Sequence, residues 1–207
     1  MADIGSHWCD LAEFVTGKRI AEVIADLSII HPYRYKPESD TPTFAAADEQ
    51  GNREKVEVNT EDSGSVLIRF EDGTKGGFSV SQVSAGRKND LSLSIDCEHY
   101  SMSWSQETPE RLWVGYRDKS NETLLKDSEL VSSEAQKLIG LPGGHGEAWA
   151  DGVKNTIHNF YDFMLSGKSM EEHAGEFATF ADGYRGMRLV EAILESARQS
   201  RWVPVHS

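Results

Sequence analysis

The stretch at residues 65–84, SVLIRFEDGTKGGFSVSQVS, decides the fold class. Apolar and small polar side chains alternate along 65–70 and again along 76–84, and a period of two predicts strands. The four residues between them, Glu71-Asp72-Gly73-Thr74, contain the Asp-Gly pair that is typical of a hairpin turn. The stretch therefore predicts two antiparallel strands with one apolar face and one face of small polar side chains.

The same alternation recurs further along the chain. In residues 91–97, Leu93 and Ile95 oppose Ser92 and Ser94. Strand patterning also marks 20–30, 56–60, 100–105, 112–116, 123–125 and the edge segment 202–205. A polar stretch at 31–53 predicts a long excursion between strands. The small polar face of the sheet has two interpretations, namely simple exposure to solvent or a flat contact between the sheets of an oligomer.

Helical periodicity interrupts the strands in four places. Amphipathic spacing predicts helices at 7–15, 133–139, 147–165 and 181–198. The first helix is expected to end at Gly17 and to be capped by Asp3 or Ser6. These patterns predict the α+β class: a large, open, antiparallel-rich mixed β-sheet with helices packed on one face, in a single domain over 1–207.

The first of these helices is also expected to turn one apolar side toward the core. That side consists of Trp8, Leu11, Ala12 and Val15.

Composition and charge exclude some classes of binding partner. The 207 residues contain 21 Lys+Arg against 34 Asp+Glu, which gives a net charge of −13. So acidic a chain repels phosphate and anionic lipid, and we expect neither a nucleic-acid nor a membrane partner. The start of the chain has no basic and apolar leader pattern, and the two cysteines, Cys9 and Cys97, are expected to be reduced thiols. A cytoplasmic protein is the expectation.

Asp3 and His7 form the first candidate site. Their spacing of four brings both side chains near one side of a helix start. The carboxylate can orient the imidazole, and the opposing effect of the helix dipole leaves the histidine able to accept or give a proton. The alternative is that Asp3 only caps the helix and His7 has no role.

Two further candidates lie on turns. His145 lies in the glycine-rich loop 140–146, which does not have the spacing of a nucleotide-binding loop. Arg87 belongs to the only compact basic turn, 84–89. The alternative for His145 is a mobile loop histidine without a role, and the alternative for Arg87 is a turn that is merely solvated. Trp8 is expected to pack and also to form a pocket wall. The remaining histidines have no metal-ligand spacing, so no metal site is predicted.

The motifs along the chain resemble those of the C-terminal domain in the glucose–fructose oxidoreductase, inositol dehydrogenase and MocA (Gfo/Idh/MocA) family of NAD(P)-dependent oxidoreductases. The likeness begins with D-I-G-S-H-W-C-D-L at residues 3–11 and spans essentially the whole chain. The other matching segments are 65–70, 79–87, Ser103-Trp104, Gly143-Gly144-His145, 180–183 and 191–197.

The resemblance implies a two-domain parent enzyme. Its N-terminal Rossmann domain would bind NAD or NADP, and none is expected on this domain alone. Asp3 and His7 would bind the reacting hydroxyl beside the nicotinamide and assist its proton transfer, and His145 would contact the substrate. No G-x-G-x-x-G motif after a strand and no Glu-Lys-Pro motif occur, so the cofactor half and the catalytic lysine are missing from this sequence. This sequence also has Cys97-Glu98-His99-Tyr100 at a turn of the sheet where such families usually have glycines.

The leading hypothesis is therefore a fragment: the substrate-binding and oligomerisation domain of a sugar or polyol dehydrogenase. The domain alone is expected to be inactive, since hydride transfer needs the cofactor. Its partners would be a sugar or polyol and further copies of itself, as a dimer or tetramer through the open sheet face. The alternative is a stand-alone, non-catalytic binding or assembly module. A third hypothesis is a metal-using hydrolase built on Asp3, His7 and His145.

Overall fold

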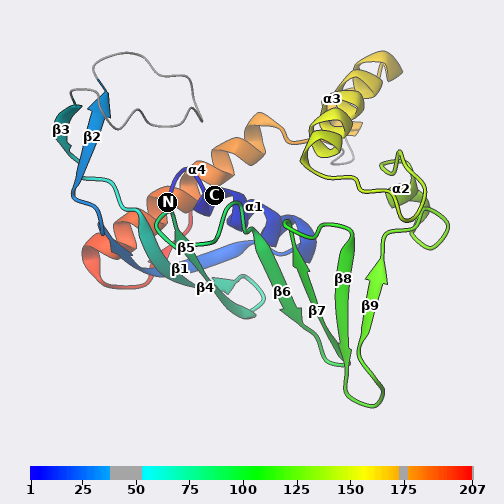
Figure 1. The fold of residues 1–207 in the computed structure, drawn as a ribbon, viewed down its shortest axis with the longest axis horizontal. Coiled ribbons are helices and arrows are strands. Elements are labelled where there is room, and N and C mark those ends of the chain that lie inside the picture. Colours follow the sequence, from blue (N-terminus) through cyan, green and yellow to red (C-terminus); the bar gives the residue numbers. More distant parts are fainter. Residues whose placement is uncertain (38–52, 173–176, 207) are drawn as a thin grey trace. The chain divides into compact units, whose positions relative to one another are not determined.

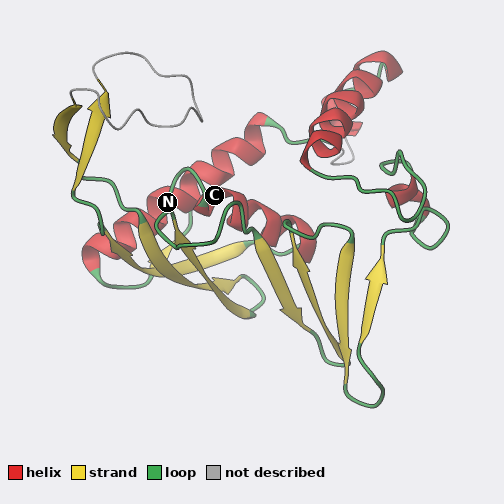
Figure 2. Cartoon of the chain, viewed as in Figure 1, coloured by secondary structure: helices red, strands yellow, loops and turns green. Residues whose placement is uncertain are grey.

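The computed structural model describes residues 1–37, 53–172 and 177–206. The chain divides into two compact units (Figure 1). The first unit consists of Met1–Ala85 with Arg185–Ser207, and the second consists of Gly86–Tyr184. Helices and antiparallel strands make up both units (Figure 2), which confirms the α+β class. The single domain over 1–207 stays a prediction.

A four-stranded antiparallel sheet forms the centre of the first unit, in the order β10-β1-β4-β5. Its strands are β1 (Ile20–Ser28), β4 (Ser63–Phe70), β5 (Lys75–Ser81) and β10 (Val203–Pro204). The predicted hairpin joins β4 to β5, with Arg69 opposite Lys75. Gly73 has a φ of 85°, which favours glycine, and the Asp72 carboxylate accepts the Thr74 N–H at 2.9 Å.

One face of this sheet packs against helices. The helices are α1 (Gly5–Thr16) and the part of α4 (Phe180–Gln199) that belongs to the first unit. The core contains Val23, Ile68 and Ile193, each at most 1% exposed. On the opposite face Ser65 and Ser79 are exposed, with their hydroxyl oxygens 3.1 Å apart. The predicted division into an apolar and a small polar face is confirmed at these positions, but Leu67 is 58% exposed on the polar face.

Helix α1 differs from its prediction in which side is buried. Its buried residues include Cys9, Ala12 and Glu13, whereas Val15 is 49% exposed. The predicted apolar side is therefore wrong at Val15, because the core-facing residues follow the 5, 9, 12 spacing of one helix face. Ile4 occupies the N-cap position, and no cap hydrogen bond from its side chain is present among the described residues.

The ends of α1 give one correction and one confirmation. Ser6 lies inside the first turn and donates to the Ala2 carbonyl oxygen at 2.8 Å, so the predicted cap is wrong. Gly17 ends the helix as predicted, with a φ of 65° and an N–H donated to the Glu13 carbonyl oxygen at 2.9 Å.

The predicted excursion at 31–53 contains a strand that the sequence did not reveal. β2 (Tyr33–Pro37) pairs antiparallel with β3 (Arg53–Glu57) in a two-stranded sheet. The expected strand at 56–60 is therefore wrong in its bounds, because pairing with β2 selects residues nearer the excursion. Residues 38–52 of the excursion lie outside the described residues.

The second unit is built on a sheet with the order β6-β7-β8-β9. Its strands are β6 (Ser92–Asp96), β7 (Tyr100–Ser105), β8 (Arg111–Tyr116) and β9 (Glu122–Leu125). Leu93 and Ile95 are half-buried and Ser92 and Ser94 are exposed, which confirms the alternation.

Helices follow the sheet of the second unit. They are α2 (Ser133–Gln136), α3 (Trp149–Ser166) and the 3₁₀ turn η1 (Met170–Glu172). Helix α2 is shorter than the predicted 133–139, because the chain continues from Lys137 in tight turns, with the Leu138 N–H donated to the Ala135 carbonyl oxygen. Helix α3 lies close to its predicted bounds. Both Cys9 and Cys97 are free thiols, as expected.

Candidate functional site

Asp3 and His7 lie together at the start of α1, and both are exposed. Asp3 precedes the helix, and its Oδ2 accepts a hydrogen bond from the Gln82 side-chain amide at 3.2 Å. Among the described residues, the structure records no hydrogen bond between Asp3 and His7. The carboxylate is thus held by an amide from the end of the β5 hairpin strand, and the imidazole lies open on the first turn. Gln82 is a contact of the candidate site that the sequence reasoning missed, although it lies within the matching segment 79–87.

Trp8 fixes the same helix start against the sheet. Its ring stacks on Phe78 of β5, with the centroids 4.4 Å apart and the planes 20° apart. Phe78 is buried, and Trp8 packs against the core as a half-buried side chain. The packing role predicted for Trp8 is therefore observed, next to the exposed His7. Whether Trp8 also forms a pocket wall remains a prediction.

A buried carboxylate holds the other end of α1. Glu13 accepts hydrogen bonds from Arg185 Nη2 at 2.8 Å, Arg19 Nη1 at 2.8 Å and the Ile20 N–H at 2.7 Å. Burial raises the pKa of Glu13, but the hydrogen bonds from Arg185, Ile20 and Arg19 outweigh it and leave the pKa below its ordinary value. The helix that follows Asp3 and carries His7 is thus tied to β1 and α4.

Arg87 lies in the second unit on an exposed turn. Its guanidinium pairs closely with the Asp90 carboxylate. The N–H groups of Lys88 and Asn89 each lie 3.3 Å from one oxygen of Glu107. The predicted basic turn is therefore partly neutralised by its own acidic neighbours, which lessens its attraction for an anionic ligand.

His145 lies exposed on the loop before α3. The backbone N–H of His145 donates to the Pro142 carbonyl oxygen at 3.2 Å, and Gly144 has a φ of 80°. Glycine accommodates this left-handed conformation without strain, so the loop can turn sharply and expose the imidazole. Two residues that the sequence reasoning did not single out, Lys126 and Glu147, hold the loop. The Lys126 ammonium contacts the His145 carbonyl oxygen, and the Glu147 carboxylate accepts the Gly140 N–H.

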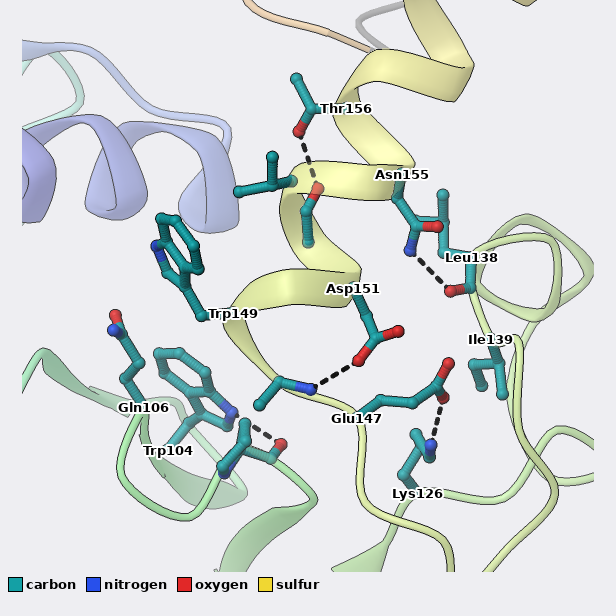
Figure 3. Close-up of a pocket in the computed structure, with 14 residues that line it drawn as sticks. Trp104, Gln106, Lys126, Leu138, Ile139, Glu147, Trp149, Asp151, Asn155 and Thr156 are labelled. Atoms are coloured by element: carbon teal, nitrogen blue, oxygen red, sulfur yellow. Dashed lines mark hydrogen bonds and ion pairs between the residues drawn. The ribbon is translucent and has the colours of Figure 1, made fainter.

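A hollow of about 470 Å³ lies at the start of α3, within the second unit (Figure 3). Trp104 and Trp149 supply its aromatic surface, and Trp149 is 73% exposed. Its polar groups are largely engaged: Trp104 donates to the Pro109 carbonyl oxygen at 3.1 Å, and Asn155 donates to the Leu138 carbonyl oxygen at 2.7 Å. Lys126 and Glu147 line the same hollow.

The candidates thus fall into two groups. Asp3, His7 and Trp8 belong to the first unit, and Arg87 and His145 belong to the second. Across the part of the chain that the structure describes, no group of three or more His, Cys, Asp or Glu side chains is arranged to hold a metal ion. A search of the same residues finds no helix long and apolar enough to cross a membrane.

Comparison with known proteins identifies the family. Residues 1–103 match the GFO/IDH/MocA C-terminal domain. This match is to the family that the D-I-G-x-H segment predicted. A levoglucosan dehydrogenase from Pseudarthrobacter phenanthrenivorans is 26% identical over 211 residues, covering 99% of this chain and 51% of that protein.

Solved structures agree with the fold. An oxidoreductase domain protein from Kribbella flavida has a TM-score of 0.79 at 26% identity, over 99% of this chain and 51% of that one. A levoglucosan dehydrogenase complexed with NADH and L-sorbose has a TM-score of 0.77 at 24% identity, over 99% of this chain and 49% of that one. The chain therefore spans about half the length of the relatives it matches, and those relatives are oxidoreductases.

Proposed function

We propose that this chain is the substrate-binding and oligomerisation domain of an NAD(P)-dependent sugar or polyol dehydrogenase. The observation that supports it best is the pair Asp3 and His7, both exposed and four residues apart at the start of a helix, within the segment that matches the family's C-terminal domain. A relative of this chain is a levoglucosan dehydrogenase, and a solved levoglucosan dehydrogenase of similar fold is complexed with NADH and L-sorbose.

In this proposal the nicotinamide cofactor is held by a half of the enzyme that this chain does not contain. The cofactor supplies the acceptor for a hydride from a carbon that bears a hydroxyl. His7 takes the hydroxyl proton as a general base, and Asp3 has an orienting role in that proton transfer. Gln82 holds one oxygen of the Asp3 carboxylate, which leaves the other for the site. His145 contacts the sugar, and Arg87 and Trp8 are secondary candidates for substrate contacts.

The proposal is tested with the full-length protein that carries this chain. It is incubated with NAD⁺ or NADP⁺ and a panel of anhydrosugars, aldoses and inositols, and formation of the reduced cofactor is followed. The proposal expects oxidation of at least one sugar by the full-length protein and none by the 207-residue chain. A full-length protein that binds sugars without oxidising them favours the alternative, a non-catalytic binding or assembly module.

The oligomer is proposed to form through the open face of the first unit's sheet. Ser65 and Ser79 are small and exposed there, and Leu67 is 58% exposed on the same face. Small side chains let two sheets approach closely. In light scattering, Ser79→Lys is expected to dissociate the oligomer, whereas Ser120→Lys on the β8–β9 turn is expected to leave it intact. An oligomer that survives Ser79→Lys contradicts this interface.

A further inference from the structure

The loop that carries His145 is closed by a single carboxylate. Glu147 Oε1 accepts the N–H of Gly140 at 2.7 Å, while its Oε2 forms a close ion pair with the Lys126 ammonium (Figure 3). Gly140 and Glu147 are the two ends of the loop, so one side chain joins both ends. The Glu147 side chain is only 8% exposed. The loop is therefore a closed structure and not a free tether.

Lys126 connects this closed loop to the sheet. Its ammonium lies 3.3 Å from the carbonyl oxygen of His145 itself and 3.4 Å from Glu110 Oε1. Its own N–H donates to the Glu110 carbonyl oxygen at 2.9 Å, directly after β9. Glu110 in turn accepts the Glu147 N–H at 2.6 Å. One ammonium thus reaches the histidine backbone and both carboxylates.

The charges in this cluster depend on each other. Burial works against the Lys126 ammonium, but the carboxylates of Glu147 and Glu110 outweigh it and raise its pKa above the ordinary value. Lys126, followed by hydrogen bonds from the loop backbone, holds the pKa of Glu147 below its ordinary value. Without Lys126, the Glu110 and Glu147 carboxylates would lose the ammonium that contacts both of them.

We propose that Lys126 is a positioning residue for His145, and that Lys126, Glu110 and Glu147 together form a latch that holds the His145 loop in its binding shape. The inference rests on the proposed function in one respect, namely that His145 contacts the sugar. The evidence for the latch itself is the set of contacts among Lys126, Glu110 and Glu147 within the second unit.

The first test measures the loop directly, in the 207-residue chain. Hydrogen exchange is followed by mass spectrometry in peptides that cover residues 140–147. Lys126→Met is expected to speed exchange there by about tenfold or more, because opening of the loop no longer breaks an ion pair. Lys126→Arg is expected to restore most of the protection. Lys119→Met, which removes the exposed partner of Glu122, serves as the matched control and is expected to change nothing at the loop.

The second test asks whether the latch acts through His145, using the full-length protein. Lys126→Met is expected to raise the sugar KM by roughly fivefold to tenfold with a smaller change in kcat, and to leave the cofactor KM unchanged. Unchanged loop exchange in Lys126→Met overturns the latch, whatever the enzyme does. If His145→Ala raises the sugar KM and Lys126→Met does not, positioning by Lys126 is overturned. If His145→Ala itself has no effect, the substrate contact of the proposed function fails.

Discussion

Arg185 Nη2 lies 2.8 Å from Glu13 Oε1, so a helix near the end of the chain holds the helix that follows Asp3 and carries His7. The same Arg185 nitrogen donates to the Ile20 carbonyl oxygen at 2.6 Å, which joins α4 to the first strand as well. Glu13 is 7% exposed, so this is a nearly buried ion pair with its hydrogen bonds satisfied. The orientation of α1 therefore depends on residues far from it in sequence.

Breaking this pair is expected to destabilise the fold. Arg185→Met leaves the Glu13 carboxylate buried with fewer donors, and we expect the free energy of unfolding to fall by about 3 kcal/mol in urea denaturation. Glu191→Gln removes the partner of Arg188 in an exposed pair and is expected to cost less than ~0.5 kcal/mol. Similar losses in the two variants would refute the structural importance of Glu13 and Arg185.

The contribution of Glu13 to the free energy of unfolding is expected to depend on pH. Because the folded-state pKa of Glu13 lies below its ordinary value, its stabilisation is complete above the unfolded-state pKa and is lost as the pH falls through the folded-state pKa. The difference in unfolding free energy between the unmodified chain and Glu13→Gln should therefore shrink from about pH 7 to about pH 3. A difference that stays constant over this range would show that the charge of Glu13 does not stabilise the fold.

The two thiols are expected to differ in reactivity. Burial, followed by the neighbouring Glu13 carboxylate, raises the pKa of Cys9 to about 12, so its thiolate is scarce. Cys97 is half-buried. Titration with an aromatic disulfide reagent should modify Cys97 in the native chain and Cys9 only after unfolding. Rapid native labelling of Cys9 in a Cys97→Ser variant would contradict its burial.

Gly17 offers a test of how α1 ends. A residue with a β-carbon at its φ of 65° is strained, and Gly17→Ala is expected to lower the unfolding free energy by about 1 kcal/mol. Gly183→Ala, at an open position of α4, is expected to be neutral or slightly stabilising because alanine favours helix. Thermal denaturation should separate the two variants, with a lower Tm for Gly17→Ala and an unchanged or slightly higher Tm for Gly183→Ala. A neutral Gly17→Ala would argue against the left-handed end.

Much of the fold follows from local patterns in the sequence. Alternation and the Asp-Gly turn predict the β4–β5 hairpin because strand period and turn chemistry act over neighbouring residues. The β2–β3 pair escapes prediction because its residues are mostly charged or aromatic and their pairing partner lies beyond residues 38–52.

The residues of the candidate site can be predicted only where a short motif carries them. Asp3, His7 and His145 stand at helix starts or glycine turns, which sequence reasoning can find. Glu13 looks like an exposed helix residue, because its partner Arg185 lies 172 residues away. Lys126 reaches Glu110 and Glu147 from a third segment, and no spacing rule joins three such segments. Long-range ion pairs depend on tertiary structure, and for that reason the residues that hold the candidate side chains were missed.

The most direct measurement is kcat for sugar oxidation by the full-length protein that carries His7→Asn, under conditions that saturate both sugar and cofactor. Asparagine keeps a polar side chain of similar reach but cannot take a proton. Proton transfer by His7 predicts a fall in kcat of about a hundredfold or more, with cofactor binding unchanged and part of the rate restored at high pH. A kcat within about twofold of the unmodified enzyme would contradict the role of His7 in proton transfer, and with it the proposed dehydrogenase function.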